Sequence, residues 1–421
     1  MKTSYKVLIV GGYDFEGTDA TSITLKSLLG FLNENQVAFL FTSSINHVCK
    51  YRHVFVSQKY FSGISNSKIV KDLSQNRSDV AGTTKSVGTT LQKCTNLIHT
   101  VGSSYRSIIN YDLNNNVKDF IKEFKPDIIY SLLANVAIMD LCVKISRYNK
   151  APIVPHFMDD WPHVMFSNSW LLYPARLMLK RYLKKTFNCS PFCLGISPKM
   201  CDEYSIEYHK VFYAFMNSCP DMYSYYSNTR ENQIIRVTYI GGLHLNRISS
   251  IIMFCEMINH FDFFKAELSI YTSNNNWVKY GHLLKGYDFV KYEGFVSNDR
   301  IFDVYNESDI LLHVESFDRD IKKYTRLSIS TKIPEYLSSG KLIIAIGPKD
   351  IASIEYLATN KAALIINGNM DKEYLYRTLR DKNLWHPFIE NARNLFLSNH
   401  KQLEQRARIN GLLEAILETR N

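Results

Sequence analysis

The sequence lacks a hydrophobic run long enough to cross a membrane as a helix. The nearest run, residues 128–139, is short and includes Ser131 and Asn135, whereas a spanning helix needs about 20 mainly apolar residues. The first six residues, Met-Lys-Thr-Ser-Tyr-Lys, lead straight into an apolar segment and do not have the pattern of a secretory signal. We therefore expect a cytoplasmic protein that is not an integral membrane protein.

Cysteine is also sparse, and its spacing matches no common metal site. Eight cysteines are spread over 421 residues without paired metal-ligand spacing, so we expect reduced thiols and no structural metal. A hydrophobic content of 46% is ordinary for a globular chain. This length can bury two separate cores, and no third domain is needed.

The chain has fewer acidic than basic residues and carries a formal net charge of +10. This balance favours acidic partners, but the basic residues are dispersed and form no known nucleic-acid-binding motif, so nucleic acid is not expected. The densest basic segment is 170–187, where five Lys or Arg residues alternate with Trp, Tyr and Leu. It is typical of an amphipathic helix at an anionic bilayer. The alternative is a core-packing helix with a basic face in solvent.

Two sets of alternating strands and helices predict an α/β protein with two doubly wound, Rossmann-like domains. The expected strands are 7–10, 37–42, 128–132, 153–157, 193–197 and 211–215 in the first domain, and 235–240, 268–271, 289–292, 310–314, 342–346 and 363–366 in the second. A polar stretch, 221–233, places the domains at 1–225 and 226–395. The helical tail 396–421, with a break expected near 398–400 or Gly411, is predicted to pack back on the first domain. Residues 57–107 are either an insertion or short helices.

Residues 328–348 hold the most specific pattern in the chain. Ser330 or Thr331 is expected to cap a helix, whose free N–H groups suit a diphosphate. Glu335 lies in the first turn, where its carboxylate can accept two hydrogen bonds from a ribose diol. Gly340 is expected to end the helix in the left-handed conformation, before a buried strand at 342–346. The alternative is an ordinary capped helix in an α/β domain.

Further candidates in the first domain follow its strands. The loop after the first strand contains Gly12 and lets a ligand approach the backbone, but its glycines do not have the dinucleotide-binding spacing, so a nicotinamide enzyme is not expected. His156 can hydrogen-bond a sugar hydroxyl, and Asp159 or Asp160 can orient an acceptor. A structural histidine is the alternative.

Two loops supply the candidates of the second domain. Gly241 and Gly242 form a close-approach turn before Arg247, which can pair with a phosphate or lie on the surface as an ordinary arginine. Glu315 and Asp318 follow a later strand. Asp318-Arg319-Asp320 has the Asp-x-Asp pattern of a divalent metal site, which three residues alone support weakly.

Together these segments resemble a GT-B-fold glycosyltransferase, and within that fold the retaining family numbered four. The resemblance covers most of the chain, with specific motifs only in its last third. Its segments are the Gly-rich first loop, Pro126-Asp127-Ile128-Ile129, His156 with its aspartates, Ile196-Ser197-Pro198, residues 241–247, Tyr292-Glu293-Gly294-Phe295-Val296, Ser308-Asp309-Ile310, residues 332–348 and the terminal helix.

The resemblance implies two domains facing a central cleft, with a nucleotide sugar mostly on the second domain and an acceptor on the first. It implies that Glu335 binds the ribose, Arg247 neutralises the diphosphate and His156 lies near the transferred sugar, and that Gly12 approaches the phosphates. The family's first glutamate corresponds to Leu327 here, so that contact is absent or supplied by Glu315 or Asp318. Gly242 replaces a frequent arginine.

With Gly242 in place of that arginine, Lys332 is the second candidate cation. We predict transfer of a sugar from a nucleoside diphosphate sugar to a saccharide or lipid-linked saccharide in surface glycan synthesis, without a metal or cofactor. Retention of configuration follows only from the resemblance.

The predicted catalytic residues are His156, Asp159, Arg247 and Lys332, and the predicted donor-binding residues are Gly12, Gly242, Arg247, Ser330, Thr331, Lys332 and Glu335. Glu315, Asp318 and Asp160 are candidates for donor-sugar or acceptor contacts. The alternatives are a GT-B-fold nucleotide-sugar epimerase or a non-catalytic sugar-nucleotide-binding subunit at a partner, and the inner face of the cell membrane is the candidate location.

Overall fold

The computed structural model describes residues 5–57, 108, 111–167, 169–223, 234–260, 265–297, 299–368 and 372–418. The chain divides into two compact units: unit 1 comprises Met1–Met216 and Glu404–Asn421, and unit 2 comprises Asn217–Leu403. The first change of unit therefore comes earlier than residue 225, because the residues after Met216 are tied to unit 2. His400 Nδ1 lies 2.9 Å from the Asn217 carbonyl oxygen, and Cys219 forms a parallel bridge with Lys401. Of the segment 57–107, all but residue 57 lies outside the described residues.

Unit 1 is built on a seven-stranded sheet in the order β3-β2-β1-β4-β5-β6-β7, and each pairing is parallel. Its strands are β1 (Val7–Gly11), β2 (Val37–Phe41), β3 (Arg52–Phe55), β4 (Ile128–Ser131), β5 (Ile153–Phe157), β6 (Cys193–Gly195) and β7 (Phe212–Ala214). The six strands expected from the sequence are all present. The additional strand, β3, lies at the sheet edge and buries only Val54, so it lacks the apolar run of a central parallel strand.

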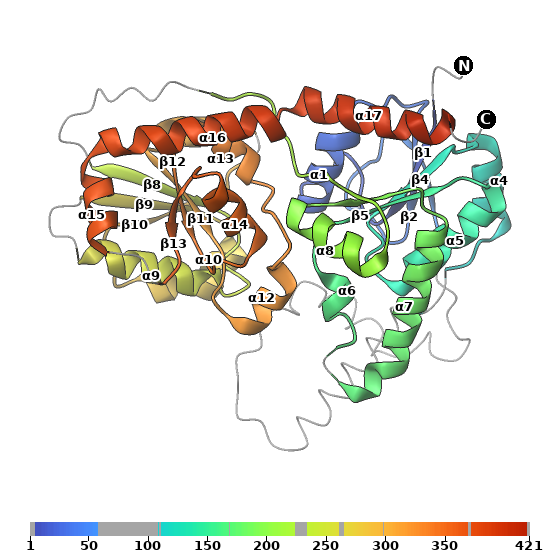
Figure 1. Ribbon diagram of the computed structural model, residues 1–421, viewed down its shortest axis with the longest axis horizontal. Coiled ribbons are helices and arrows are strands. Elements are labelled where there is room, and N and C mark those ends of the chain that lie inside the picture. The colour runs from blue at the N-terminus through green and yellow to red at the C-terminus, as the bar shows by residue number, and fades with distance from the viewer. Residues whose placement is uncertain are drawn as a thin grey trace. The chain divides into compact units, whose positions relative to one another are not determined.

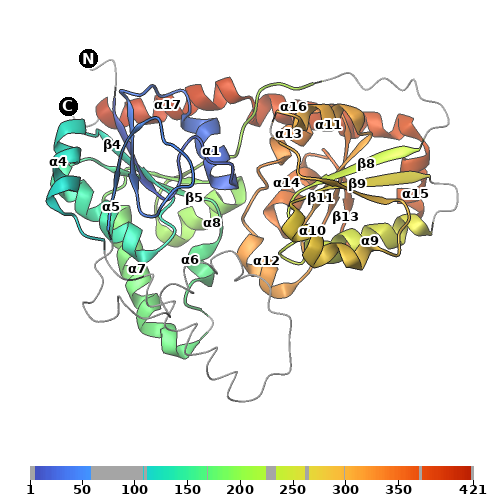
Figure 2. The same ribbon diagram turned by 180° about the vertical axis from the view of Figure 1, so that it is seen from behind.

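Helices cover both faces of this sheet (Figures 1 and 2). They are α1 (Ala20–Leu29), α4 (Asn115–Phe124), α5 (Val136–Asn149), α6 (Trp161–Val164), η1 (Trp170–Leu172), α7 (Tyr173–Asn188), α8 (Pro198–Tyr208) and most of α17 (Gln402–Glu418). No helix in the described ranges is both long enough and apolar enough to span a membrane.

The C-terminal helix α17 is fastened to the unit-1 core. Arg406 donates from Nε to the Ser27 carbonyl oxygen at 2.9 Å and from Nη2 to that of Lys26 at 3.0 Å, and both carbonyls lie in the last turn of α1. Ile409 and Leu413 are buried among the residues of β1 and β2. The expected break in the tail is confirmed at residues 400–401, where α16 (His386–Asn399) ends and α17 begins, while Gly411 lies within α17.

Unit 2 contains a six-stranded parallel sheet in the order β10-β9-β8-β11-β12-β13. The strands are β8 (Ile235–Ile240), β9 (Ala266–Tyr271), β10 (Val290–Gly294), β11 (Ile310–Val314), β12 (Leu342–Ile346) and β13 (Leu364–Ile366), as the sequence predicts. The helices are α9 (Arg247–Asn259), α10 (Asn274–Tyr280), η2 (Gly281–Leu284), α11 (Ile301–Glu307), α12 (Arg319–Thr325), α13 (Ile333–Ser338), α14 (Ala352–Thr359), α15 (Lys372–Arg380), η3 (Lys382–Trp385) and α16.

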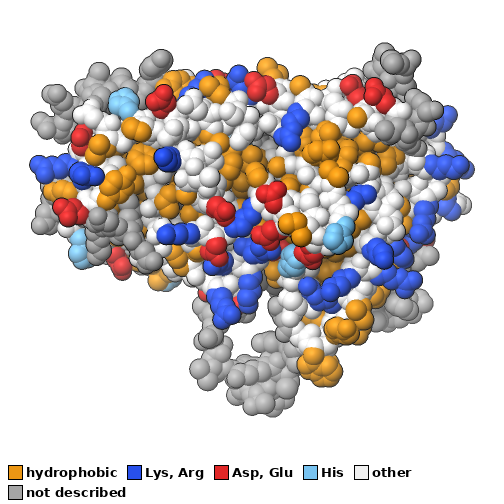
Figure 3. Space-filling view, viewed as in Figure 1, with side chains coloured by type: hydrophobic (Ala, Val, Ile, Leu, Met, Phe, Trp, Pro, Cys, Tyr) orange, Lys and Arg blue, Asp and Glu red, His pale blue; other side chains and the backbone are white. Residues whose placement is uncertain are grey.

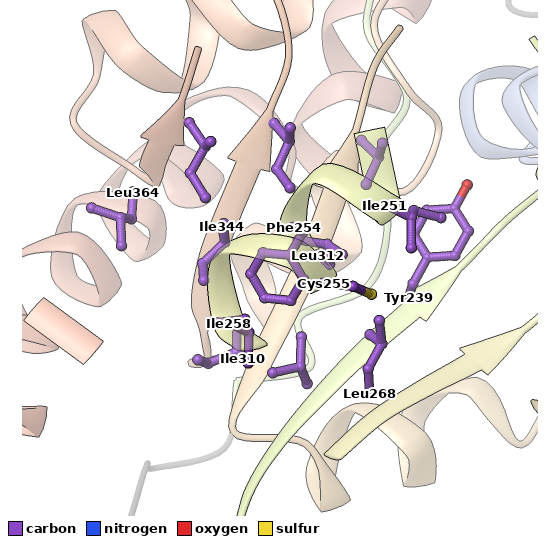
Figure 4. Packing of buried hydrophobic residues seen from close by; sticks show 14 of the residues in the cluster. Tyr239, Ile251, Phe254, Cys255, Ile258, Leu268, Ile310, Leu312, Ile344 and Leu364 are labelled. Carbon is purple, nitrogen blue, oxygen red and sulfur yellow. The ribbon is translucent and has the colours of Figure 1, made fainter. Parts of the chain in front are cut away.

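The core of unit 2 holds the start of α9 in place. Figure 4 shows Ile251, Phe254 and Ile258 of α9 lying against side chains of the central strands, among them Leu312 and Ile344. These residues recur at spacings of three and four, which places them on one face of the helix. Burying such a side chain contributes about 1.5–3 kcal/mol. The helix start that carries the candidate arginine is therefore fixed by packing.

Candidate functional site

The candidate site of unit 2 lies at the carboxyl ends of its central strands. In this sheet β8 lies between β9 on one side and β11 on the other. The connection that follows β8 runs to one side of it, and the connection that leads to β11 runs to the other side. The carboxyl end of β8 is therefore the topological switch point, where parallel α/β sheets usually bind ligands. Gly241 and Gly242 follow β8, and Glu315 follows β11. The predicted donor-site residues of the second domain therefore come from the loops at this edge.

Arg247 and Glu315 face each other across the switch point. Arg247 is the first residue of α9, and its Nη2 lies 3.8 Å from Glu315 Oε2. The Glu315 side chain is only 6% exposed, whereas that of Arg247 is 22% exposed. A buried carboxylate thus holds a guanidinium that still reaches the surface, where it can donate to a phosphate.

The surroundings of Glu315 keep it fixed. Ser250 donates to its carbonyl oxygen at 2.8 Å, and Ser353 donates to Oε1 at 3.5 Å. His313 Nε2 lies 3.7 Å from the same oxygen, but burial lowers the pKa of His313 to about 3. The histidine is therefore neutral at pH 7 and does not balance the carboxylate charge, which leaves that role to Arg247.

The loop before α9 is shaped by contacts of Gly242 and by two residues with a left-handed backbone. A Cβ on Gly242 would come within 2.3 Å of the His244 ring, and the Tyr239 hydroxyl donates to the Gly242 carbonyl oxygen at 2.8 Å. Leu245 and Asn246 both have positive φ values, 57° and 52°. Two consecutive left-handed residues are costly, and here they turn the chain so that α9 starts at Arg247.

Lys332 and Glu335 form a second charged pair. Lys332 Nζ lies 3.9 Å from Glu335 Oε2, and the buried hydroxyl of Tyr305 donates to the same oxygen at 2.6 Å. The two side chains are 25% and 20% exposed. Tyr305 thus fixes the orientation of the Glu335 carboxylate from the buried side. The carboxylate remains partly exposed, so it can still accept hydrogen bonds from a ribose.

Two buried tyrosines connect the charged pairs. Burial raises the pKa of Tyr239 to about 12, with Arg247 and Glu315 close enough to act on it electrostatically. The pKa of Tyr336 is also raised, mainly by burial and further by Tyr239 and Glu335. Both tyrosines are neutral near pH 7. We refer to these two charged pairs at the carboxyl edge of the unit-2 sheet, Arg247 with Glu315 and Lys332 with Glu335, as the cluster.

The expected helix cap at Ser330 or Thr331 is wrong. α13 begins at Ile333, with Lys332 at the N-cap position and no side-chain cap. Ser330 Oγ accepts only a long hydrogen bond, 3.4 Å, from the Lys332 N–H, and the Thr331 carbonyl oxygen accepts from Asn217 Nδ2 at 2.8 Å. A short turn before Pro334 replaces the cap, although Gly340 does adopt the expected left-handed φ of 73°.

The side chains of Asp318 and Asp320 make separate local contacts. Asp318 caps α12, where its Oδ1 accepts from the N–H groups of Asp320 and Ile321 at 2.9 and 3.1 Å. Asp320 pairs with Lys323 at 2.9 Å. Within the described ranges, no three His, Cys, Asp or Glu side chains are grouped as metal ligands. Asp318 is exposed, whereas Glu315 is buried, so Glu315 alone of the two belongs to the cluster.

His156 lies inside β5 rather than after it, and it is fully buried. Its Nδ1 is 2.7 Å from the Tyr130 hydroxyl, and its Nε2 has no hydrogen-bond partner in the described part of the chain. Burial lowers the pKa of His156 to about 3. The structure therefore gives this histidine a place in the core and no exposed atom with which to contact a sugar.

Asp160 is also buried, and it holds local structure together. Its Oδ1 accepts from the Tyr204 hydroxyl at 2.8 Å and pairs with His163 Nδ1. His163 Nε2 in turn lies 2.7 Å from Glu207 Oε2, so the segment after β5 is fastened to α8. The hydrogen bond that His163 donates to Asp160 raises the pKa of His163. Asp159 is half-buried, and its role stays a prediction.

Gly12 is exposed in the loop after β1, and a Cβ there would lie 2.4 Å from Ser43 Oγ. Beside it is a pair of residues that the sequence analysis did not single out, Asp14 and His47, whose side chains are 2.8 Å apart. No spacing rule connects them, because they are 33 residues apart and meet only when β1 and β2 pair. The contact of Tyr305 with Glu335 was missed for the same reason, since these two residues are also far apart in the sequence. Leu327, at the position of the missing glutamate, is fully buried.

Two hollows elsewhere in the described residues contain none of the predicted site residues. One, of about 260 Å³, is lined by Arg52, His53 and Phe124 among others. The other, of about 310 Å³, is lined by Lys349, Lys361 and their neighbours. Neither combines a buried carboxylate with an accessible cation, so the charged cluster at the switch point of unit 2 is the better candidate site.

No family model matches the chain, and no curated protein matches it in sequence. Solved structures do match it in fold. Sucrose-phosphate synthase from Thermosynechococcus elongatus is 10% identical, with a TM-score of 0.61 over 98% of this chain and 100% of its own. The lipopolysaccharide outer core galactosyltransferase WaaB, at 12% identity, gives 0.57 over 97% and 99%. WaaG, a glycosyltransferase involved in lipopolysaccharide biosynthesis, is also 12% identical and gives 0.55 over 97% and 99%. At this identity the likeness shows the fold, which is GT-B with two Rossmann-like α/β domains.

Proposed function

We propose that the protein is a glycosyltransferase that moves a sugar from a nucleoside diphosphate sugar to a hydroxyl of a saccharide or lipid-linked saccharide in surface glycan synthesis. The observation that carries this proposal is the cluster at the switch point of unit 2, where Arg247 and Lys332 lie beside the carboxylates of Glu315 and Glu335. The shared fold with structures named as glycosyltransferases supports the same class of reaction.

Each residue of the cluster has a chemical role in this reaction. When the bond between the sugar and the diphosphate breaks, negative charge grows on the leaving diphosphate. Arg247 and Lys332 stabilise that charge without moving, since Glu315 and Glu335 already position them. Glu335 accepts hydrogen bonds from the ribose hydroxyls. Two cations suffice for this stabilisation, so we propose that the reaction needs no metal and no cofactor.

Three finer features of the proposal come from the resemblance to family four: membership of that family, retention of configuration, and an acceptor bound by unit 1. A nucleotide-sugar epimerase and a non-catalytic binding subunit are the competing functions. The buried Leu327 in place of a glutamate favours the subunit, whereas the accessible Arg247, Lys332 and Glu335 favour the enzyme. An epimerase would turn over its nucleotide sugar without an acceptor, so acceptor dependence distinguishes it from a transferase.

The test is a panel of UDP-, GDP-, ADP- and CMP-linked sugars, measured by thermal shift and by donor hydrolysis with and without EDTA. Wild type is compared with Glu335→Ala and with Glu256→Ala, a matched control on the exposed side of α9. We expect one nucleotide to raise the melting temperature in wild type and in the control, with EDTA present, and to lose its effect in Glu335→Ala. No response to any donor would favour the binding subunit at a partner, and a response abolished by EDTA would contradict metal independence.

We also propose that unit 1 contacts an anionic membrane through η1 and α7, at the cytoplasmic face. Trp170, Tyr173 and Leu177 are 83%, 63% and 50% exposed, and they continue along the helix into the exposed Arg181 and Lys184. Figure 3 shows hydrophobic side chains at the start of this helix and Lys or Arg along the rest of it. An aromatic end followed by basic residues suits the acyl boundary and the headgroups of one bilayer. The inner face, Leu179 and Leu183 included, is buried as a core-packing helix requires.

Co-sedimentation with vesicles tests this contact. We expect binding to vesicles containing phosphatidylglycerol and weak binding to pure phosphatidylcholine. Trp170→Ser with Leu177→Ser should reduce binding at least tenfold, while Leu403→Ser, a control that is 81% exposed on α17, should not. Equal binding by the double variant, or no binding by wild type, would contradict the membrane contact and leave the transferase proposal standing.

A further inference from the structure

Unit 1 contains a buried carboxylate that holds an exposed histidine in one orientation. Asp14 is fully buried in the loop after β1. Its Oδ1 accepts from the backbone N–H groups of Glu16 and Gly17 at 2.9 and 3.1 Å. Both of its carboxylate oxygens lie 2.8 Å from Nε2 of His47, in the segment after β2. The two backbone donors hold this carboxylate in place, so it accepts a hydrogen bond from the ring Nε2–H in a fixed direction.

This contact sets the tautomer of His47. Because Nε2–H donates to Asp14, the neutral ring keeps its lone pair on Nδ1. The His47 side chain is 34% exposed, while Asp14 is not exposed at all. Within the described ranges, Nδ1 has no hydrogen-bond partner. The pair therefore presents one oriented hydrogen-bond acceptor to the surface.

The support beneath the pair is rigid. Phe15 packs edge-on against Phe39 of β2 and against Tyr51, with ring centroids 5.3 Å apart in each case. Cys49 also faces Asp14, and burial raises the pKa of its thiol to about 11, with Glu16 a further negative group nearby. The thiol is therefore neutral, and the carboxylates that act on it are those of Asp14 and Glu16. The loops on either side of the pair meet where Gly12 approaches Ser43.

The position of the pair is one where ligands bind. Asp14 follows β1 and His47 follows β2, and these two strands are parallel neighbours. Their carboxyl ends share one edge of the sheet, the edge at which α/β domains hold ligands. A structural histidine of this fold looks different, as His156 shows: it is fully buried within a strand. His47 is exposed at the end of the sheet and directed by a buried partner.

We propose that Asp14 and His47 form a binding site for a hydroxyl group of the saccharide acceptor, which donates its proton in a hydrogen bond to His47 Nδ1. Asp14 is a positioning residue that acts through His47. The inference rests on the proposed function and assigns its acceptor side to named residues.

The experiment measures KM for donor and acceptor separately, in wild type, His47→Gln and Asp14→Asn. Glutamine can still donate to Asp14 but has no atom at the position of Nδ1. We expect His47→Gln to raise the acceptor KM about tenfold, or ~1.4 kcal/mol, with the donor KM within twofold. Asp14→Asn should raise the acceptor KM as well, since the ring is then no longer held in one tautomer. His53→Gln, on the exposed edge strand β3, is the matched control and should change neither value.

The split between kcat and KM provides a second readout that a structural role would not move, because damage to the fold of unit 1 would lower kcat at saturating acceptor as well. His47→Gln should keep its kcat at saturating acceptor and change only the acceptor KM. An unchanged acceptor KM in a folded His47→Gln protein, or a loss confined to kcat, would overturn the inference. If wild type itself transfers no sugar but binds a donor, the proposed function fails instead, and the two failures are thereby distinguished.

Discussion

At the scale of single residues, burial decides what each histidine and carboxylate can do. His156 and His313 are enclosed and neutral, whereas His47 reaches the surface on a buried carboxylate. The sequence could place Arg247, Lys332 and Glu335 in the loops of one domain, since all three follow recognisable strand and turn signals, and their shared role in donor binding stays a prediction. It could not predict the burial of His156, because its spacing of three and four residues to Asp159 and Asp160 says nothing of which side chains point into the core.

The contact between Tyr130 and His156 can be tested by removing the tyrosine hydroxyl. In Tyr130→Phe, Nδ1 of the buried histidine loses the hydroxyl at 2.7 Å. An unsatisfied buried polar atom costs about 1–3 kcal/mol, so the free energy of unfolding should fall by that amount in urea titrations. The donor KM should stay the same. An unchanged free energy of unfolding would mean that His156 finds another partner.

The orientation of Glu335 by Tyr305 gives a second prediction at this scale. In Tyr305→Phe, the carboxylate loses the donor at 2.6 Å and can rotate away from the ribose. We expect the donor Kd to rise about three- to tenfold, as loss of one hydrogen bond of ~1 kcal/mol implies, measured by isothermal titration. Tyr148→Phe, on the surface of unit 1, is the control. An equal donor Kd in Tyr305→Phe and Tyr148→Phe would show that Tyr305 does not contribute to donor binding.

At the scale of helices and strands, the pattern of apolar runs is enough to place the sheet. All the central strands of both units were predictable, because strands covered by helices on both faces must be continuously apolar. The edge strand β3 was not, since only Val54 of its four residues is buried. A helix cap also differs from expectation: α13 has no side-chain cap, although Ser330 or Thr331 was expected to supply one. Caps depend on the path of the loop, which local sequence does not determine.

The docking of α17 on unit 1 predicts a contrast between two leucines of one helix. Leu413 is 1% exposed among core residues, while Leu403 is 81% exposed. Leu413→Ala should lower the free energy of unfolding by about 2–4 kcal/mol, because it leaves a cavity in the core. Leu403→Ala should change it by less than ~0.5 kcal/mol. Similar effects of the two substitutions in urea titrations would contradict the packing of this helix.

At the scale of the whole molecule, the chain leaves unit 1 after Met216 and returns to it at Glu404. The sequence indicated two units and the return of the tail, because the polar stretch and the broken final helix are visible in composition. It placed the first crossing nine residues late, since the ties of Asn217 and Cys219 to His400 and Lys401 join residues about 180 positions apart.

Buried histidines predict how the stability of the whole chain depends on pH. Burial lowers the pKa of His156 and His313 to about 3 and that of His400 to about 4. The unfolded chain takes up a proton at each site below about pH 6.5 and the folded chain does not, so stability is lost as pH falls from 6.5 toward 4. At pH 5 each of these histidines lowers the free energy of unfolding by on the order of 2 kcal/mol.

His163 acts in the opposite direction. Asp160 raises the pKa of its ring, so its stabilising contribution is complete below about pH 6.5 and is lost as pH rises through the higher folded value. The net prediction is a lower urea midpoint at pH 5 than at pH 7.5. A midpoint that is equal or higher at pH 5 would show that the buried histidines find solvent or an anionic partner when protonated.

The central claim is that the cluster in unit 2 binds the diphosphate of a nucleotide sugar, and calorimetric titration of the donor tests it most directly. Wild type is compared with Arg247→Ala and Lys332→Ala, and with Arg300→Ala, whose side chain is 69% exposed and pairs within its own helix. We predict that the first two variants bind the nucleoside diphosphate at least tenfold more weakly and the nucleoside alone equally well, while Arg300→Ala matches wild type. Unchanged affinity for the diphosphate in folded Arg247→Ala and Lys332→Ala proteins would contradict the claim.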